Sequence, residues 1–128
     1  MAQTFYKDTD GKSVDVTLDY TISGQRPILV DGWVGLPGGS GDSGDNIALI
    51  CDGGVYQWQA PSGLSLVVGA TVYVDVSETG SANEIPDAGF VTAATADTIP
   101  LFKVLTEKDG NNWCTVKLIN FNLNNFEG

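Results

Sequence analysis

The sequence predicts an all-β fold, a small single domain of the β-barrel or β-sandwich kind with extended arms at both ends. Glycine is abundant, with 16 among 128 residues, and only 17% of the residues are charged. Short segments rich in β-branched and aromatic residues recur between turn-forming residues, as in barrels and sandwiches. No segment keeps a helical period over two turns. A chain of this length has the size of one domain and buries enough surface to fold without covalent staples.

The first strands follow a polar N-terminal arm, residues 1–13. Residues 14–18 alternate apolar and polar side chains, which is typical of a half-buried strand. The next strand covers residues 27–30 and begins with proline, which is tolerated at a first strand position because its missing N–H is not needed there. Asp-Gly at 31–32 predicts a turn, and residues 33–36 form a third short strand.

The middle of the chain predicts a hairpin. The glycine- and aspartate-rich residues 37–45 form a loop, and the apolar run 47–51 is short enough to be a buried strand. Asp-Gly-Gly at 52–54 is a hairpin-turn signal. Residues 55–59 alternate again, so the two runs are expected to pair with each other.

The last part of the body contains a strand at 71–76, by composition and by alternation. Residues 91–96 are rich in alanine and threonine and fit either a strand or a loop. Residues 99–105 and 113–119 are predicted to pair as a hairpin across the polar connection 107–112.

The two arms carry aromatic residues. The body spans residues 14–120 and the C-terminal tail residues 121–128, where apolar residues are separated mainly by asparagine. Such a tail either closes the sheet as a last strand or adds to a neighbouring subunit by edge pairing. The candidate contact residues for a partner or subunit surface are Phe5, Tyr6, Trp33, Trp58, Phe121 and Phe126.

Charge and hydropathy exclude several partners. Sixteen acids against six bases give a net charge of −10. Binding to nucleic acid or to an anionic membrane needs a basic face, so we expect neither partner. No apolar stretch approaches the roughly 20 residues that cross a bilayer. Residues 1–7 lack the charged start and apolar run of a signal peptide, so we expect a soluble protein without an N-terminal export signal.

The chain is not expected to be an enzyme. Histidine is absent, which removes the usual base for a serine or cysteine nucleophile and the commonest transition-metal ligand. Residues 41–44 spell Gly-Asp-Ser-Gly, the string around the nucleophile of trypsin-like proteases, but without the histidine it predicts only a loop. Residues 39–44 fit G-x-G-x-x-G, but a strand-like run follows instead of the required helix. Cys51 and Cys114 lack metal-ligand spacing and either stay free in the core or form one disulfide. No cofactor or metal is expected.

The three tryptophans leave a second function open. Trp33, Trp58 and Trp113 lie in three different predicted strands. Tryptophan supplies a large apolar area, so these residues are expected to anchor the core or a subunit interface. The alternative is an aromatic platform that stacks on sugars, as in a carbohydrate- or receptor-binding β module.

The order of motifs resembles a known family. The resemblance rests on residues 22–37 (ISGQRPILVDGWVGLP), 47–58 (IALICDGGVYQW), 68–75 (VGATVYVD) and the closing pair IPLFKV and CTVKLI. This arrangement resembles the small capsid decoration (cement) proteins of tailed bacteriophages and prophages.

The resemblance implies a structural protein without an active site. Its members form homotrimers on the outer surface of the expanded capsid, where they clamp neighbouring major capsid proteins. It therefore implies a partner, the major capsid protein of a tailed phage, and a location in the virion after synthesis in the host cytoplasm. Because a trimer engages several capsid subunits at once, multivalent binding would resist their separation.

Overall fold

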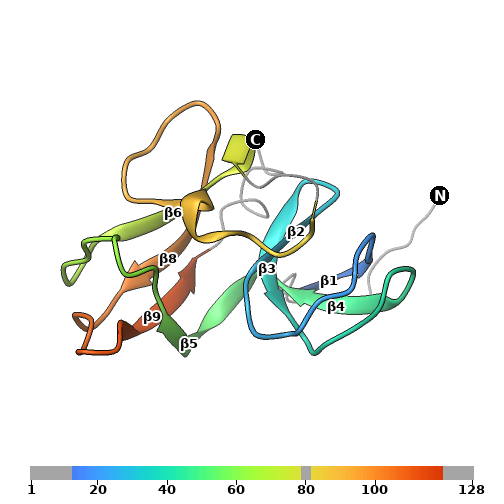
Figure 1. Ribbon diagram of the computed structural model, residues 1–128, viewed down its shortest axis with the longest axis horizontal. Coiled ribbons are helices and arrows are strands. Elements are labelled where there is room, and N and C mark those ends of the chain that lie inside the picture. The colour runs from blue at the N-terminus through green and yellow to red at the C-terminus, as the bar shows by residue number, and fades with distance from the viewer. Residues whose placement is uncertain (1–12, 79–81, 120–128) are drawn as a thin grey trace.

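The computed structural model describes residues 13–78 and 82–119, and these are all-β apart from two single-turn 3₁₀ helices. Two antiparallel sheets lie side by side (Figure 1). The strands are β1 (Ser13–Thr17), β2 (Ile28–Val30), β3 (Trp33–Pro37), β4 (Asn46–Ile50), β5 (Asp52–Gln59), β6 (Thr71–Asp75), β7 (Phe90–Val91), β8 (Thr98–Val104) and β9 (Trp113–Ile119). The helices are η1 (Val76–Glu78) and η2 (Asp87–Gly89). The predicted all-β class is confirmed.

The first sheet has four strands in the order β1-β4-β3-β2. Its β2–β3 hairpin pairs Val30 with Trp33 across a two-residue turn. Both turn residues have positive φ, 51° at Asp31 and 85° at Gly32. Two consecutive left-handed residues define the type I′ turn, whose twist matches that of paired strands. The turn predicted at 31–32 is therefore confirmed.

The second sheet has five strands in the order β5-β9-β8-β6-β7. The predicted hairpin of the closing strands is confirmed, since β8 and β9 pair antiparallel with Lys103 opposite Lys117. The ambiguous segment 91–96 is mostly loop, because β7 ends at Val91.

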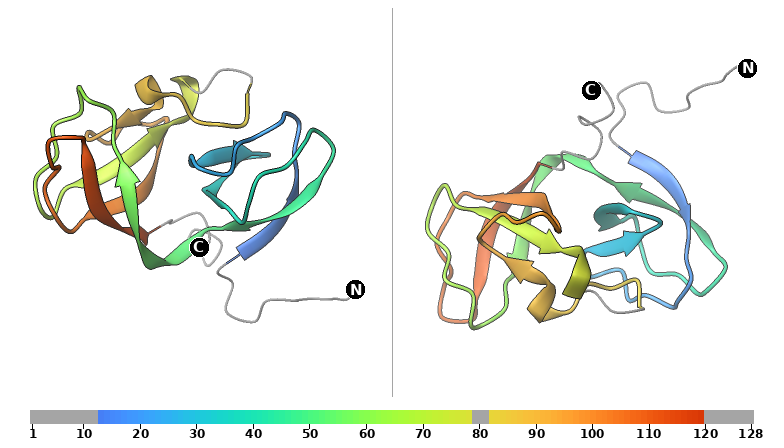
Figure 2. Two further views of the ribbon diagram at one scale, coloured as in Figure 1. Left: turned by 60° about the horizontal axis from the view of Figure 1, so that its bottom comes forward. Right: turned by 90° about the horizontal axis from the view of Figure 1, so that it is seen from above.

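The hairpin predicted from 47–51 and 55–59 is wrong. β4 pairs with β1 and β3, whereas β5 pairs with β9. Gly53 and Gly54 have φ of 84° and 93°, and the β5–β9 register shifts between Asp52 and Val55. The two glycines therefore form a β-bulge rather than a turn. Glycines with positive φ are suited to a bulge as well as to a turn, so the sequence signal was ambiguous. The chain runs from β4 into β5 and so passes from one sheet to the other, as Figure 2 shows.

The core has two parts. The larger cluster lies within the five-stranded sheet and takes alternate side chains of its strands, such as Val72 and Val74 of β6, and it extends to Val34 of β3. The smaller cluster lies under the four-stranded sheet and contains Leu49 and Ile28. Since Val34 packs with the larger cluster while its strand belongs to the other sheet, the two sheets are held together by apolar contact.

A second tie between the sheets is the segment before η2. The Leu29 N–H donates to the Asn83 carbonyl at 2.8 Å, and the Ile85 N–H donates to the Pro27 carbonyl at 3.1 Å. An isolated bridge pairs Ile28 with Glu84. The segment thus covers the outer edge of β2 and removes it as a site for strand addition.

Both cysteines are free and buried. Cys51 belongs to the smaller cluster and Cys114 to the larger one. Burial, helped by the neighbouring carboxylate of Asp52, raises the pKa of the Cys51 thiol to about 11. Burial is also the main cause that raises the pKa of Cys114. Each thiol therefore stays protonated at neutral pH and acts as a small apolar side chain.

We expect neither thiol to react with a disulfide reagent at pH 8 until the protein unfolds, because the nucleophile is the thiolate.

The raised pKa of Cys51 also makes the free energy of unfolding depend on pH. An unfolded thiol ionises near 9.0, below the folded value for Cys51. The free energy of unfolding should therefore be insensitive to this group below about pH 9 and fall as pH rises toward 11. Thiol labelling with and without denaturant measures the reactivity, and chemical unfolding from pH 8 to 11 measures the pH dependence of the free energy of unfolding. Rapid labelling of the native chain would contradict the burial.

Candidate docking surfaces

The strand β5 has one free edge. Within residues 13–78 and 82–119 it pairs only with β9, and the Ala60 N–H continues this ladder by donating to the Asn112 carbonyl at 2.9 Å. In an antiparallel ladder, backbone groups alternate between the partner and the opposite edge. Tyr56 and Trp58 of β5, like Ala60, therefore turn their N–H and C=O toward β9. Val55, Gln57 and Gln59 turn theirs toward the open edge.

A groove runs along this edge. Its two adjoining parts have cavity volumes of about 550 and 230 Å³, and both are bounded by β5 on one side and by residues 25–27 on the other. Trp58 lines both parts. Pro61 and Trp113 lie at one end, and Leu36, Pro37 and Ile50 lie at the other. The groove therefore follows the strand rather than crossing it.

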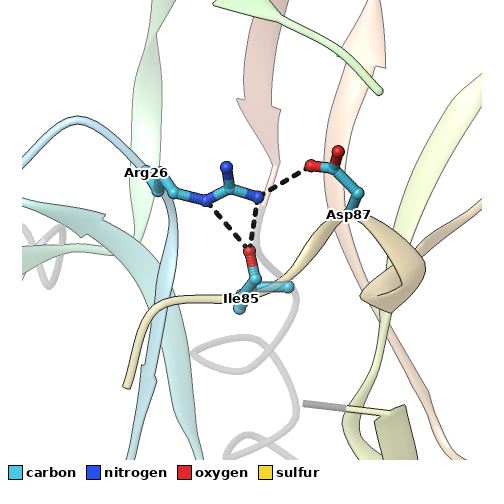
Figure 3. Close-up of polar contacts among 3 residues, drawn as sticks. All are labelled: Arg26, Ile85 and Asp87. Atoms are coloured by element: carbon cyan, nitrogen blue, oxygen red, sulfur yellow. Dashed lines mark hydrogen bonds and ion pairs between the residues drawn. The ribbon is translucent and has the colours of Figure 1, made fainter. Parts of the chain in front are cut away.

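Arg26 fixes the wall opposite β5. Its Nε and Nη2 donate to the Ile85 carbonyl at 3.2 and 2.9 Å, and Nη2 also meets the Asp87 carboxylate at 2.9 Å (Figure 3). No hydrogen bond within the described residues uses Nη1. The guanidinium is 40% exposed, so this pair positions the wall more than it adds stability.

The outer face of the five-stranded sheet is a second exposed surface. On β9, Trp113 and Lys117 face outward, while Cys114, Val116 and Leu118 are buried. Lys117 lies opposite Lys103 of β8. Trp113 is 43% exposed and lies opposite Gln59 at the end of the groove. This face thus combines two of the six basic residues of an acidic chain with an exposed indole.

The predicted contact residues fall into three groups. Phe5, Tyr6, Phe121 and Phe126 lie outside the described residues. Trp33 is half-buried against the smaller cluster. Trp58 is only 8% exposed, with ring centroids 5.1 Å from Phe90 and 5.0 Å from Phe102, and it presents one side to the groove.

Trp113 is the tryptophan most available to a partner, and it was not among the predicted contact residues. Its exposure could have been read from the sequence. In residues 113–118, cysteine, valine and leucine occupy the even positions and therefore mark the inner face. The indole of the first residue must then point outward.

The two ends of the described chain leave the fold at the same place. Ser13 at the start of β1 lies opposite Ile50, and Ile119 at the end of β9 lies opposite Asp52. Ile50 and Asp52 are separated only by Cys51, where the chain passes between the sheets. Both predicted arms are therefore attached to the described domain at one place.

The glycine-rich loop 37–45 is held by its own polar groups. The Asp42 N–H donates to the Asp45 carboxylate at 2.8 Å, and the Ser43 hydroxyl donates to the Asp19 carbonyl at 3.0 Å. These groups have a structural role. No cluster of three or more cysteine, aspartate or glutamate side chains suited to a metal ion occurs in residues 13–78 and 82–119. No helix within these ranges is long and apolar enough to span a membrane.

Comparison with known proteins identifies the class. The profile of a family described as phage cement protein matches residues 9–105, which is more than half of the chain. The chain belongs to the phage cement protein family, a family of structural proteins of the virion capsid. No curated protein and no solved structure matches this chain.

Proposed function

We propose that this protein decorates the outer surface of the expanded capsid of a tailed phage as a homotrimer. There it stabilises the contacts between neighbouring major capsid proteins. The observation that carries the proposal is the family match over residues 9–105. The protein works by binding alone, and no step of its function involves catalysis.

The placement of the chain ends supports the proposal. Ser13 and Ile119, the two ends of the described chain, lie at the crossover between β4 and β5, so both aromatic segments are attached to the domain at one place. We assign Phe5 and Tyr6 to the capsid surface and Phe121 and Phe126 to capsid or subunit contacts. Trp33 and Trp58 support these contacts from the core, and Trp113 joins the exposed surface.

The acidic charge supports recognition of a basic docking surface. A net charge of −10 favours association with a positively charged patch and disfavours nucleic acid. Binding should therefore weaken with added salt, since screening reduces attraction between exposed charges.

The function is tested with expanded and unexpanded shells of the phage that encodes this chain. The purified protein should bind expanded shells saturably, bind unexpanded shells poorly and raise the temperature at which expanded shells dissociate. Binding that leaves shell stability unchanged would contradict the cement role. Absence of binding to expanded shells would refute the assignment to the capsid.

Removing residues 2–12 should weaken binding to expanded shells at least tenfold, a loss of about 1.4 kcal/mol. The deletion ends before β1, which starts at Ser13, so the isolated domain should unfold at nearly the same temperature as the full chain. The full chain is the binding control, and a thermal melt is the folding control. Unchanged binding by the deletion variant would show that the N-terminal arm does not contribute to binding the capsid.

A further inference from the structure

We propose that the groove along β5 receives residues 120–128 of a second copy of this chain as an added strand. This inference rests on the proposed homotrimer and names the contact that builds it. An extended segment that adds to an exposed sheet edge gains main-chain hydrogen bonds there, and neighbouring pockets select its side chains.

The edge offers unused backbone groups beside a preformed groove. Val55, Gln57 and Gln59 direct N–H and C=O groups toward it, and no hydrogen bond within the described residues uses them. The two glutamine side chains are held on the sheet face. Gln57 Nε2 donates to the Thr115 hydroxyl at 2.7 Å, and Gln59 Nε2 donates to the Asn111 carbonyl at 3.1 Å. These bonds leave the edge itself open to an incoming backbone.

The other described edges are less suited to strand addition. The segment that contains Asn83 and Ile85 already covers β2. The edge strand β7 has only two residues, Phe90 and Val91. The edge strand β1 carries further interactions at Ser13 and Asp15. β5, with eight residues and a groove beside it, is the long open edge of the described fold.

Charge selects residues 120–128 as the occupant. Copies with a net charge of −10 repel one another, so a contact between them needs segments of low charge. The charged groups that line the groove are Arg26 and Asp87, which form an ion pair. Residues 120–128 carry one charged side chain, Glu127, among asparagines and apolar residues. The unused Nη1 of Arg26 provides this acid with a charge-assisted partner.

The position of Ile119 favours a second copy over the chain's own tail. Ile119 lies opposite Asp52, on the β9 side of β5, whereas the free edge is on the other side. The chain's own tail would have to cross over β5 to reach it. Nine residues span up to about 30 Å when extended, so about five of them can pair with β5 while the other four form the link to the donor copy. Because the contact joins different surfaces of each copy, it is heterologous and can close a ring of three.

The first test is a pair of substitutions at one position. Gln57→Pro removes an N–H that points into the groove and leaves the β9 ladder complete. Gln57→Ala keeps the N–H and is the matched control. By light scattering, the full chain and Gln57→Ala should be trimers, and Gln57→Pro and the 120–128 deletion should be monomers. Circular dichroism should show the same β content in all four. Trimers in all four proteins would overturn the proposal.

The second test distinguishes a second copy from the chain's own tail. A mixture of the deletion variant, which can only accept a strand, and Gln57→Pro, which can only donate one, should form a one-to-one dimer. A mixture that stays monomeric would overturn the second copy as occupant, as would a full chain that is monomeric alone. Capsid binding is measured separately. Shell binding by a monomeric full chain would refute this contact and leave the decoration function standing.

Discussion

Asn83→Ala should lower the free energy of unfolding by about 3 kcal/mol, because three hydrogen bonds of roughly 1 kcal/mol each are lost. The Asn83 side chain accepts from the N–H groups of Asp19 and Tyr20 at 2.9 and 3.0 Å, and its amide donates to the Leu29 carbonyl at 3.1 Å. Among the described residues, Asn83 is the one polar residue that is buried, with 4% exposure. One side chain thus fixes both the β1–β2 connection and β2.

The loss should lower the melting temperature by about 10 °C for a domain of this size. Asn83→Asp is the informative comparison. It keeps the two acceptor contacts to Asp19 and Tyr20 but places an oxygen against the Leu29 carbonyl. This variant should also be destabilised at neutral pH and should recover part of the loss in acid, where the carboxyl is protonated and can donate. Melting curves of both variants at pH 7 and pH 4, each against the parent chain, measure the effect. An alanine variant as stable as the parent would show that the three contacts contribute nothing.

Gly35→Ala should cost about 2–3 kcal/mol, since a Cβ has no space at this point of β3. The added atom would overlap the Ile50 carbonyl oxygen and lie 3.1 Å from the Ile50 carbonyl carbon and 3.2 Å from Leu49 Cγ. Because the overlapping atoms of Ile50 belong to the backbone and cannot rotate away as a side chain can, β3 and β4 must move apart. The clash would fall on Ile50, the last residue of β4, which lies just before the chain crosses into β5.

Gly39→Ala is the matched control for Gly35→Ala. No atom lies within 4 Å of its added Cβ, and its φ is not among the positive values. Its free energy of unfolding should change by less than about 0.5 kcal/mol. Chemical unfolding of both variants provides the comparison. Equal stability of Gly35→Ala and Gly39→Ala would contradict the close approach of β3 to β4.

The strands were predictable because their signals are local. Alternation located β1, β6 and β9 within one residue at each end, and Asp-Gly at 31–32 located the β2–β3 turn. Pairing was harder, since the ladders join residues far apart in the chain, such as Ser13 with Ile50 and Gln59 with Trp113. Gly53 and Gly54 gave a wrong hairpin because a turn and a bulge need the same left-handed backbone.

The groove was not predictable from the sequence. Its walls are residues 25–27 and the β5 edge, which only tertiary packing brings together. Asn83 carries no local signal either, because its partners Asp19, Tyr20 and Leu29 belong to distant segments. The exposed position of Trp113, by contrast, was predictable from the alternation in residues 113–118, although Trp113 was not among the predicted contact residues.

The shared exit of Ser13 and Ile119 has a consequence for engineering. Neighbouring ends can be joined by a short linker, which makes the fold suitable for circular permutation. New ends opened in the exposed loop 107–112 would lie where β8 turns into β9, away from the crossover. A peptide inserted there would be displayed at the Trp113 end of β9, whereas Ile119 at the other end of this strand lies opposite Asp52 beside the crossover.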